Sequence, residues 1–298
     1  MRLPRFFYLV LILSVVTLAG QAAPKADDLL GPDSKRQPGV PQGTVSQHFW
    51  KDSKIFPGTV RDYYVYVPEQ YDGTSPAALM VFQDGKKYQD ESNWFRIPIV
   101  FDNLIHKGDM PVTIAILIEP GSKGKYANGI PVFDRSNRSR EYDAVSDRYA
   151  RFLMEEIIPE VANDYKLTSN PEYRAICGTS SGAICAFTAA WMYPDYFRKV
   201  LSGNGTFVNI IGGHEYPSMI RSHSKKPIRV FIQDGANDLN NDYGDWYLAN
   251  QQMVSALEYR GYDVEAVWGT GGHNAFEFGP YLPTSLRWLW RDHVDGNL

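Results

Sequence analysis

The stretch at residues 175–186, AICGTSSGAICA, constrains the fold of this chain more than any other segment. An apolar, β-like run leads to the pentapeptide Gly178-Thr179-Ser180-Ser181-Gly182, and a run of small residues typical of a helix follows it. A serine on such a strand-to-helix turn has a strained backbone and an exposed hydroxyl, while side chains at the flanking glycines would collide with the strand and the helix. Because G-x-S-x-G also arises by chance, other residues must decide whether Ser180 is a nucleophile.

The remaining pattern predicts an α/β fold, with a mostly parallel central sheet, antiparallel strands at its N-terminal side and helices on both faces. We expect strands over 44–50, 60–67, 78–82, 112–118, 198–202, 229–233 and 263–268, and one that ends at Cys177. We expect helices over 94–106, interrupted by Pro98, over 143–161, capped by Asp143 and kinked near Pro159, and over 181–192, 246–260 and 284–292. Polar residues 120–140 are expected to form a long loop near the site.

The chain divides into three parts. Residues 1–22 read as a secretory signal peptide, with Arg2 and Arg5 before a 14-residue apolar run over 6–19 and small residues at 20–22. An uncleaved membrane anchor is the alternative, although a bilayer span needs about 20 residues. Residues 23–42 are predicted to be a flexible lead-in, and 43–298 a single domain. The signal predicts an exported protein, periplasmic or secreted.

Net charge and residue content limit the partners, disulfides and cofactors that we expect. The net charge of −4 argues against nucleic acid as a partner. The two cysteines, Cys177 and Cys185, are expected to be small core residues rather than a disulfide, because a bridge would distort the turn that holds Ser180. No metal-ligand cluster stands out in the sequence, so we expect neither a metal nor a cofactor. The sequence does not indicate an oligomeric state.

A base and an acid follow Ser180 in an order that suits a Ser-acid-His triad. His273 lies in a glycine-rich loop after the last predicted strand, and Asp238 lies in the loop after the strand over 229–233. Asp234, Asp242 and Asp245 share that loop, so residue pattern alone leaves the acid open, with Asp245 also a candidate helix cap. The expected oxyanion donors are the backbone N–H of Ser181 and one at Gly85 or Lys86.

Motifs spread over residues 57–274 resemble the Putative esterase branch of the α/β-hydrolases, which includes enterochelin esterases, feruloyl and acetylxylan esterases and S-formylglutathione hydrolases. The matching segments are PGTVRDYYVYVPEQY (57–71), VFQDGKKY (81–88), NRSREYD (137–143), FLMEEIIPEV (152–161), GTSSG (178–182), YPDYFRKVLSGNG (193–205), GANDLNN (235–241) and GGHN (271–274). Asp84-Gly85 and the segment over 138–141 are most similar to enterochelin esterases. The resemblance implies an α/β-hydrolase fold, a triad of Ser180, Asp238 and His273, and no need for a metal.

The resemblance also suggests a substrate site. Arg138, Arg140 and Glu141 either line the substrate mouth or form an internal ion-pair set. Trp246 either belongs to an aromatic substrate pocket or packs in the core. The expected activity is that of an exported serine hydrolase of carboxylic esters, acting on a small-molecule or carbohydrate-linked ester. The alternatives are an acyltransferase with the same triad and a non-catalytic binding protein on the same scaffold.

Overall fold

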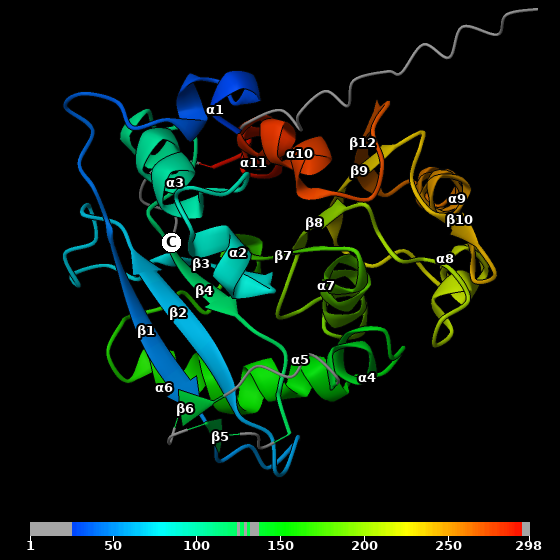
Figure 1. The fold of residues 1–298 in the computed structure, drawn as a ribbon, viewed down its shortest axis with the longest axis horizontal. Helices are drawn as coiled ribbons and strands as arrows, with labels where there is room; N and C mark the ends of the chain where they lie inside the picture. The colour runs from blue at the N-terminus through cyan, green and yellow to red at the C-terminus, as the bar shows by residue number, and fades with distance from the viewer. Residues whose placement is uncertain (1–25, 124–125, 128–129, 132–136, 294–298) are drawn as a thin grey trace, which may run out of the picture.

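The computed structural model describes residues 26–123, 126–127, 130–131 and 137–293 (Figure 1). The predicted signal peptide lies outside these residues. A twisted eight-stranded sheet runs through the molecule in the order β1-β2-β4-β3-β7-β8-β9-β12. Its strands are β1 (Thr44–Trp50), β2 (Arg61–Val67), β3 (Ala78–Gln83), β4 (Thr113–Ile118), β7 (Arg174–Thr179), β8 (Lys199–Gly203), β9 (Arg229–Gly235) and β12 (Asp263–Gly269).

Strand direction follows the sequence prediction. β1 pairs with β2, and β2 with β4, in antiparallel fashion, while every other neighbouring pair in the large sheet is parallel. The central strands β3, β4, β7 and β8 are buried along their whole length, as expected of parallel strands covered on both faces. Parallel pairing brings the carboxyl ends of β3, β7, β8, β9 and β12 to one edge, and the loops that follow these ends carry the candidate site. Two short hairpins, β5 (Tyr126–Ala127) with β6 (Ile130–Pro131) and β10 (Asn240–Asn241) with β11 (Gly244–Asp245), complete the β-structure of the described residues.

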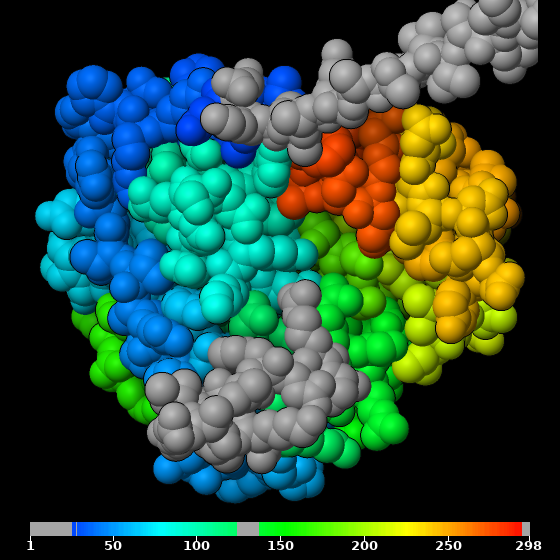
Figure 2. Space-filling view, in the orientation of Figure 1, coloured from blue at the N-terminus to red at the C-terminus, as the bar shows by residue number. Residues whose placement is uncertain are grey.

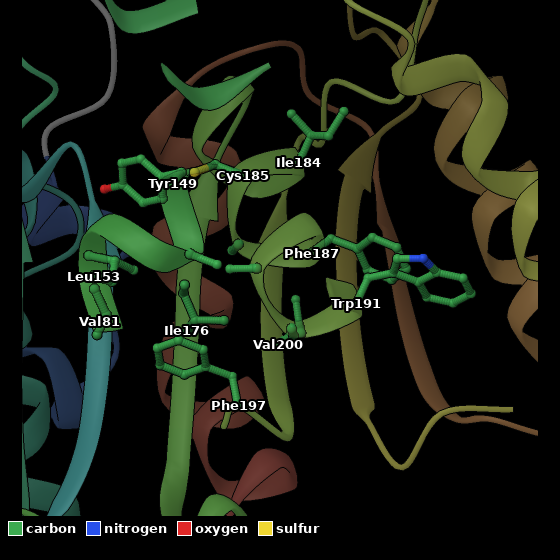
Figure 3. Close-up of a cluster of buried hydrophobic side chains, with 14 of the residues drawn as sticks. Val81, Tyr149, Leu153, Ile176, Ile184, Cys185, Phe187, Trp191, Phe197 and Val200 are labelled. Atoms are coloured by element: carbon green, nitrogen blue, oxygen red, sulfur yellow. The ribbon is translucent and has the colours of Figure 1, made fainter. Parts of the chain in front are cut away.

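Helices cover both faces of the sheet. They are α1 (Ala26–Leu29), α2 (Gly85–Gln89), α3 (Ile97–His106), α4 (Arg138–Tyr142), α5 (Arg148–Phe152), α6 (Ile158–Ala162), α7 (Ser181–Met192), α8 (Tyr216–Ser222), α9 (Trp246–Tyr259), α10 (Ala275–Phe278) and α11 (Leu282–Leu289). In one apolar cluster, helices α5, α6, α7, α8 and α9 pack against one face of the sheet. In a second cluster, α2, α3, α10 and α11 pack against the other face. Figure 3 shows part of the first cluster, which includes Ile176 of β7, Val200 of β8 and Ile184, Phe187 and Trp191 of α7. The rings of Phe187 and Trp191 stack with their centroids 5.8 Å apart.

The sequence predictions for the helices are partly wrong at their ends. Pro98 lies in the first turn of α3, where its missing N–H costs nothing, rather than interrupting the helix. Asp143 ends α4 instead of capping the next helix, which begins after Asp147. A single π-turn at Leu153–Ile157 joins α5 to α6 just before Pro159, at the predicted kink. Helices α1, α2, α4, α8 and α10 were not predicted, and α4 begins within the segment over 120–140 that was expected to be a loop. The two cysteines are free and buried, as expected.

The predicted lead-in is attached to the domain wherever the structure describes it. Leu30 and Ser34 are buried, and the Asn103 side chain of α3 donates to the carbonyls of Asp33 and Lys35 at 2.9 Å each. Figure 2 shows these N-terminal residues, in blue, lying against the cyan segments that include α3. Residues 26–42 therefore form part of the packed structure, unlike the flexible segment that their Pro- and Gly-rich composition suggested.

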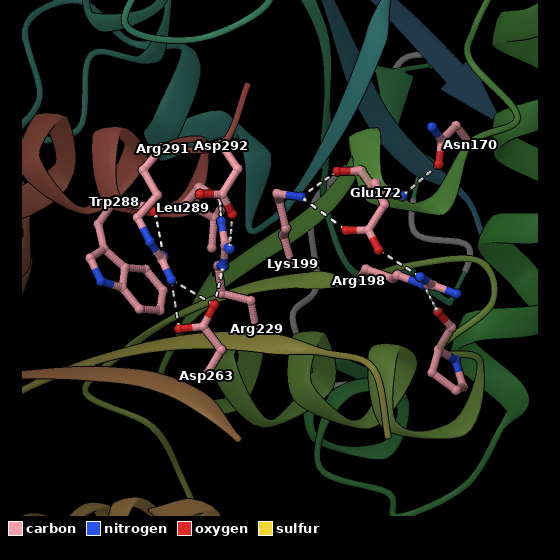
Figure 4. Close-up of polar contacts among 11 residues, drawn as sticks. Asn170, Glu172, Arg198, Lys199, Arg229, Asp263, Trp288, Leu289, Arg291 and Asp292 are labelled. Atoms are coloured by element: carbon pink, nitrogen blue, oxygen red, sulfur yellow. Dashed lines mark hydrogen bonds and ion pairs between the residues drawn. The ribbon is translucent and has the colours of Figure 1, made fainter. Parts of the chain in front are cut away.

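Charged side chains form pairs at the amino ends of β8 and β9, the end of the sheet opposite Ser180 (Figure 4). Arg229, at the start of β9, donates to Asp263 at 2.6 Å and also bonds Asp292. Lys199, at the start of β8, donates to the backbone carbonyl of Glu172. Burial lowers the pKa of Lys199 to about 8, although the charge of Glu172 opposes this change. Arg229 also donates to the Leu289 carbonyl at 3.0 Å, so it attaches the end of α11 to the sheet.

Asp102 of α3 attaches the end of the N-terminal segment to the domain. Its buried carboxylate bonds Arg36 and accepts from the Gly43 N–H at 2.8 Å and the Tyr66 hydroxyl at 2.6 Å.

We expect Asp102→Ala to lower the free energy of unfolding by about 1–3 kcal/mol, because it leaves buried donors unpaired. It should also accelerate trypsin cleavage after Lys35 and Arg36. In urea unfolding, the partly exposed Asp109→Ala should stay within about 1 kcal/mol of wild type; equal losses in both variants would contradict this attachment.

Candidate active site

Ser180 lies on a sharp turn between β7 and α7. Its φ of 59° and ψ of −128° are unusual for a residue with a side chain, so the turn is strained as predicted. The backbone N–H of Ser180 donates to the Gly203 carbonyl of β8 at 3.0 Å, which helps to hold the turn. A Cβ atom at Gly178 would lie 2.1 Å from the Gly182 carbonyl oxygen, and one at Gly182 would lie 3.2 Å from Gln83. Gly178 is therefore required by the close packing of β7 and α7, whereas a side chain at Gly182 would be a tight fit against β3.

The loops after β9 and β12 bring Asp238 and His273 to Ser180. Nε2 of His273 lies 2.8 Å from the Ser180 hydroxyl, and Nδ1 lies 2.6 Å from Oδ1 of Asp238. Among the candidate aspartates, Asp238 is the one that bonds His273. Asp242 is exposed, and Asp245 caps α9 by accepting from the Leu248 N–H. This arrangement can pass a proton from Ser180 to an imidazole that a carboxylate orients.

Asp238 and Asp234 form a carboxyl pair. Burial acts to raise the pKa of Asp238, but hydrogen bonds with His273 and Asp234 outweigh it and hold the pKa below its ordinary value. Burial, together with the hydrogen bond and charge of Asp238, raises the pKa of Asp234 to about 8, although the donors Gly235 and Asn204 act to lower it. Asp238 is consequently the ionised member beside His273, and Asp234 holds a proton at neutral pH.

The structure supports some of the predicted oxyanion donors and excludes one of them. Ser181 is the first residue of α7, so its N–H has no acceptor within the helix and lies beside the Ser180 side chain. The prediction for Lys86 is wrong, because its N–H donates to the Glu119 carboxylate at 2.8 Å. The N–H of Asp84 bonds the Tyr142 hydroxyl at 3.3 Å. Gly85 remains the candidate in this loop, and a Cβ there would lie 2.0 Å from the backbone of Leu117.

A polar pocket of about 240 Å³ opens beside Ser180. It is lined by Asp84, Lys87, Phe95, Arg138, Thr179, Ser180, Asn204, His273, Asn274 and Ala275. Figure 2 shows the face on which the cyan, green and orange segments that supply these residues meet. Arg138 donates two hydrogen bonds of 2.7 Å each to the buried Asp84 carboxylate. Although burial acts to lower the pKa of Arg138, this pairing raises it, so Arg138 stays cationic in the pocket wall.

The other substrate-binding candidates lie elsewhere. Glu141 is buried and bonds Arg61 with distances of 2.7 and 3.0 Å, which corrects its placement at the substrate mouth in favour of the internal ion pair. Arg140 is exposed and does not line the pocket. Trp246 is buried behind the triad, where its indole N–H donates to Thr206 at 3.2 Å. Thr206 in turn lies 3.3 Å from the Ser180 hydroxyl.

Sequence reasoning missed Lys87, Asn204 and Thr206. Lys87 and Asn204 line the pocket, and the Asn204 side chain bonds both Asp234 and Asp238. Asn204 also has a positive φ of 47°, a second strained position next to Ser180. Its place directly after a predicted strand, in the segment SGNG, was the available signal.

Among the described residues, no cluster of three or more His, Cys, Asp or Glu side chains is suited to a metal ion. Within the same residues, every helix is too short or too polar to cross a membrane.

Comparison with known proteins identifies the family. A family model described as "Putative esterase" matches residues 56–295. The chain belongs to the Putative esterase family. This membership assigns it to the carboxylic ester hydrolases as a class.

Relatives of this Putative esterase share modest sequence identity with it. It is 24% identical over 181 residues to an uncharacterised protein of Bacillus subtilis, covering 60% of this chain and 69% of that protein. It is 21% identical over 255 residues to the iron(III) enterobactin esterase of Dickeya dadantii, covering 80% of this chain and 53% of the relative. The chain thus spans about half the length of that curated esterase.

Solved structures show the same α/β-hydrolase fold. The enterobactin esterase of Shigella flexneri, crystallised in the presence of enterobactin, matches with a TM-score of 0.68 and 20% identity, covering 87% of this chain and 63% of that chain. A ferulic acid esterase of Anaeromyces mucronatus matches with a TM-score of 0.63 and 20% identity, covering 86% and 95% of the two chains.

The buried pair of Arg61 and Glu141 predicts a large loss of stability on substitution. Glu141→Ala leaves the Arg61 charge buried without its carboxylate partner, so the free energy of unfolding should fall by about 3–5 kcal/mol in urea titrations. The exposed neighbour Arg140→Ala should stay within about 0.5 kcal/mol of wild type. A Glu141→Ala protein as stable as Arg140→Ala would show that the ion pair does not anchor α4.

Proposed function

We propose that this protein is an exported serine hydrolase that cleaves carboxylic esters through Ser180, His273 and Asp238. One observation carries the proposal: the Ser180 hydroxyl, on a strained turn, is 2.8 Å from Nε2 of an imidazole whose Nδ1 is 2.6 Å from a buried carboxylate. A hydroxyl is a weak nucleophile, and these contacts supply the base and the orienting group that it needs. Family membership supports the same chemistry.

The reaction proceeds in two halves. His273 takes the proton of Ser180 as its oxygen attacks the ester carbonyl, and Asp238 stabilises the imidazolium that forms. The Ser181 N–H, with Gly85 as the candidate second donor, stabilises the oxyanion. The imidazolium then protonates the departing alcohol, which leaves an acyl group on Ser180. Water, deprotonated by His273, attacks this acyl-enzyme and releases the free acid, restoring Ser180 and neutral His273.

The pocket favours oxygen-rich esters. Arg138 and Lys87 place positive charge around Asp84, and Thr179, Asn204 and Asn274 add polar side chains beside the reacting hydroxyl. Phe95 supplies an aromatic wall. Cationic and polar groups of this kind bind phenolate, catecholate or carboxylate oxygens better than plain alkyl chains. We therefore propose hydroxylated aromatic esters as the substrate class, in line with the enterobactin and ferulic acid esterases among its structural neighbours.

Removal of the nucleophile is the direct test of the proposed hydrolysis. Ser180→Ala should lower kcat for a p-nitrophenyl ester by a factor of about 10⁴–10⁶, because the acyl-enzyme is no longer formed. The exposed Ser222→Ala is the matched control and should keep wild-type rates. Ester hydrolysis by folded Ser180→Ala at the wild-type rate would refute the role of Ser180.

Product analysis separates hydrolysis from acyl transfer. With a feruloyl or catecholate ester and an added alcohol acceptor, we expect free acid as the main product by liquid chromatography. A new ester that accumulates faster than free acid would instead support the acyltransferase alternative. A folded protein that yields neither product, and whose Ser180 does not react with a fluorophosphonate, would support the binding-protein alternative.

Export rests on the basic and apolar pattern of residues 1–22. In a bacterial host with tagged full-length protein, we expect the enzyme in the periplasmic or medium fraction, with an N-terminus that begins near Ala23. Retention of Met1 on a cytosolic protein would contradict export without affecting the proposed ester hydrolysis.

A further inference from the structure

Asp234 lies at the end of β9, four residues before Asp238, and its side chain is fully buried. Three donors bond its carboxyl group. The Gly235 N–H donates to Oδ1 at 2.7 Å, the Asn204 amide to Oδ1 at 3.1 Å, and the Asn250 amide to Oδ2 at 2.7 Å. Such complete bonding fixes the orientation of the carboxyl group.

The same group is coupled to the acid of the triad. The Asn204 amide also donates to Oδ2 of Asp238 at 3.3 Å, so one amide nitrogen bridges the two carboxyl groups. The hydrogen bond and charge of Asp238 also act to raise the pKa of Asp234. The Asp238 side chain is itself fully buried. Two buried carboxylates this close cannot both be ionised, so one of them must keep a proton. His273 stabilises charge on Asp238, which leaves the proton on Asp234.

We propose that Asp234 is a positioning residue of the active site, whose protonated carboxyl donates to Asp238 and holds that carboxylate in line with Nδ1 of His273. The proposal rests on the proposed serine hydrolase function, because it concerns the acid of that triad. Asp234 touches neither Ser180 nor the pocket and acts only through Asp238 and Asn204.

The groups that face Asp234 come from five elements. Asp238 and His273 come from the loops after β9 and β12, and Glu277 comes from α10, where its carboxylate lies beside Gly235. The loop after β8 and helix α9 present the amides of Asn204 and Asn250. Loss of the Asp234 proton would therefore put a second negative charge beside Asp238 and remove the bond that orients it. Asp238 would move away from its place at His273.

The alkaline limb of the pH profile of kcat/KM tests this coupling. In the wild type we expect kcat/KM to fall by about tenfold per pH unit above pH 8, as one group loses its proton. Asp234→Asn keeps a donor for Asp238 but cannot ionise, so its kcat/KM at pH 7 should stay within about fivefold of wild type and its alkaline limb should disappear. Asp234→Ala, which has no donor, should lose about 100-fold at all pH values. The exposed Asp242→Asn, on the same loop, should keep the wild-type profile.

A wild-type alkaline limb that persists in Asp234→Asn would overturn the proposal, as would a wild type without such a limb. A second measurement serves if Asp234→Asn does not fold. Infrared spectra of the wild type should contain the carbonyl band of a protonated carboxyl group that disappears as the pH rises through about 8. Absence of this band at pH 7 would equally overturn the proposal.

Fluorophosphonate labelling keeps failure of this proposal distinct from failure of the proposed function. If Ser180 is labelled in the wild type but the pH profiles of wild type and Asp234→Asn coincide, only the role of Asp234 is wrong. If Ser180 is not labelled and Ser180→Ala still hydrolyses esters, the serine hydrolase function itself is wrong.

Discussion

Close contact between β7 and α7 is the constraint on which the rest of this molecule depends. Gly178 and the Gly182 carbonyl are so near that no side chain fits between them, and the chain must turn within one residue. That residue is Ser180, which takes a positive φ and is held by the Gly203 carbonyl of β8. The fold tolerates the strain of this turn because both elements are buried. β7 lies in the middle of the sheet, and α7 is buried from Ser181 to Trp191. Strain at the site is thus opposed by packing throughout the core.

Two buried polar groups extend this rigid turn into a site. On one side, Asp84 directly follows β3 and binds Arg138 of α4, so the loop after β3 and the helix after the long polar segment meet at the pocket. On the other side, Asp234 and Asn204 join the loops after β8 and β9 behind the triad. Each group would be costly to bury alone, and each is satisfied by a partner distant in sequence. The pocket is therefore defined by pairs of residues that form only when the whole sheet is assembled.

These long-range pairs also explain which predictions succeeded. Apolar runs and glycines report local structure, so the parallel strands, α7 and the proximity of Ser180, Asp238 and His273 could be predicted from the sequence. The burial of Glu141 depends on Arg61, 80 residues away, and nothing in the segment over 138–141 distinguishes it from exposed Arg140. The Lys86 amide is likewise bonded by Glu119, which lies in a different loop. Composition suggested a flexible segment before residue 43, because the local sequence does not reveal its partner. That partner is Asp102, which lies much later in the chain, on α3, and bonds Arg36 and Gly43.

The central claim is that Ser180 carries the acyl group between the two halves of ester cleavage. Rapid-quench mass spectrometry with a slowly deacylating ester tests it most directly, because the intermediate itself is weighed and its peptide sequenced. The account predicts a protein heavier by one acyl group within the first turnover, with the added mass on the peptide that contains Ser180. Ester cleavage with no acylated protein, or with the acyl group on another residue, would contradict it.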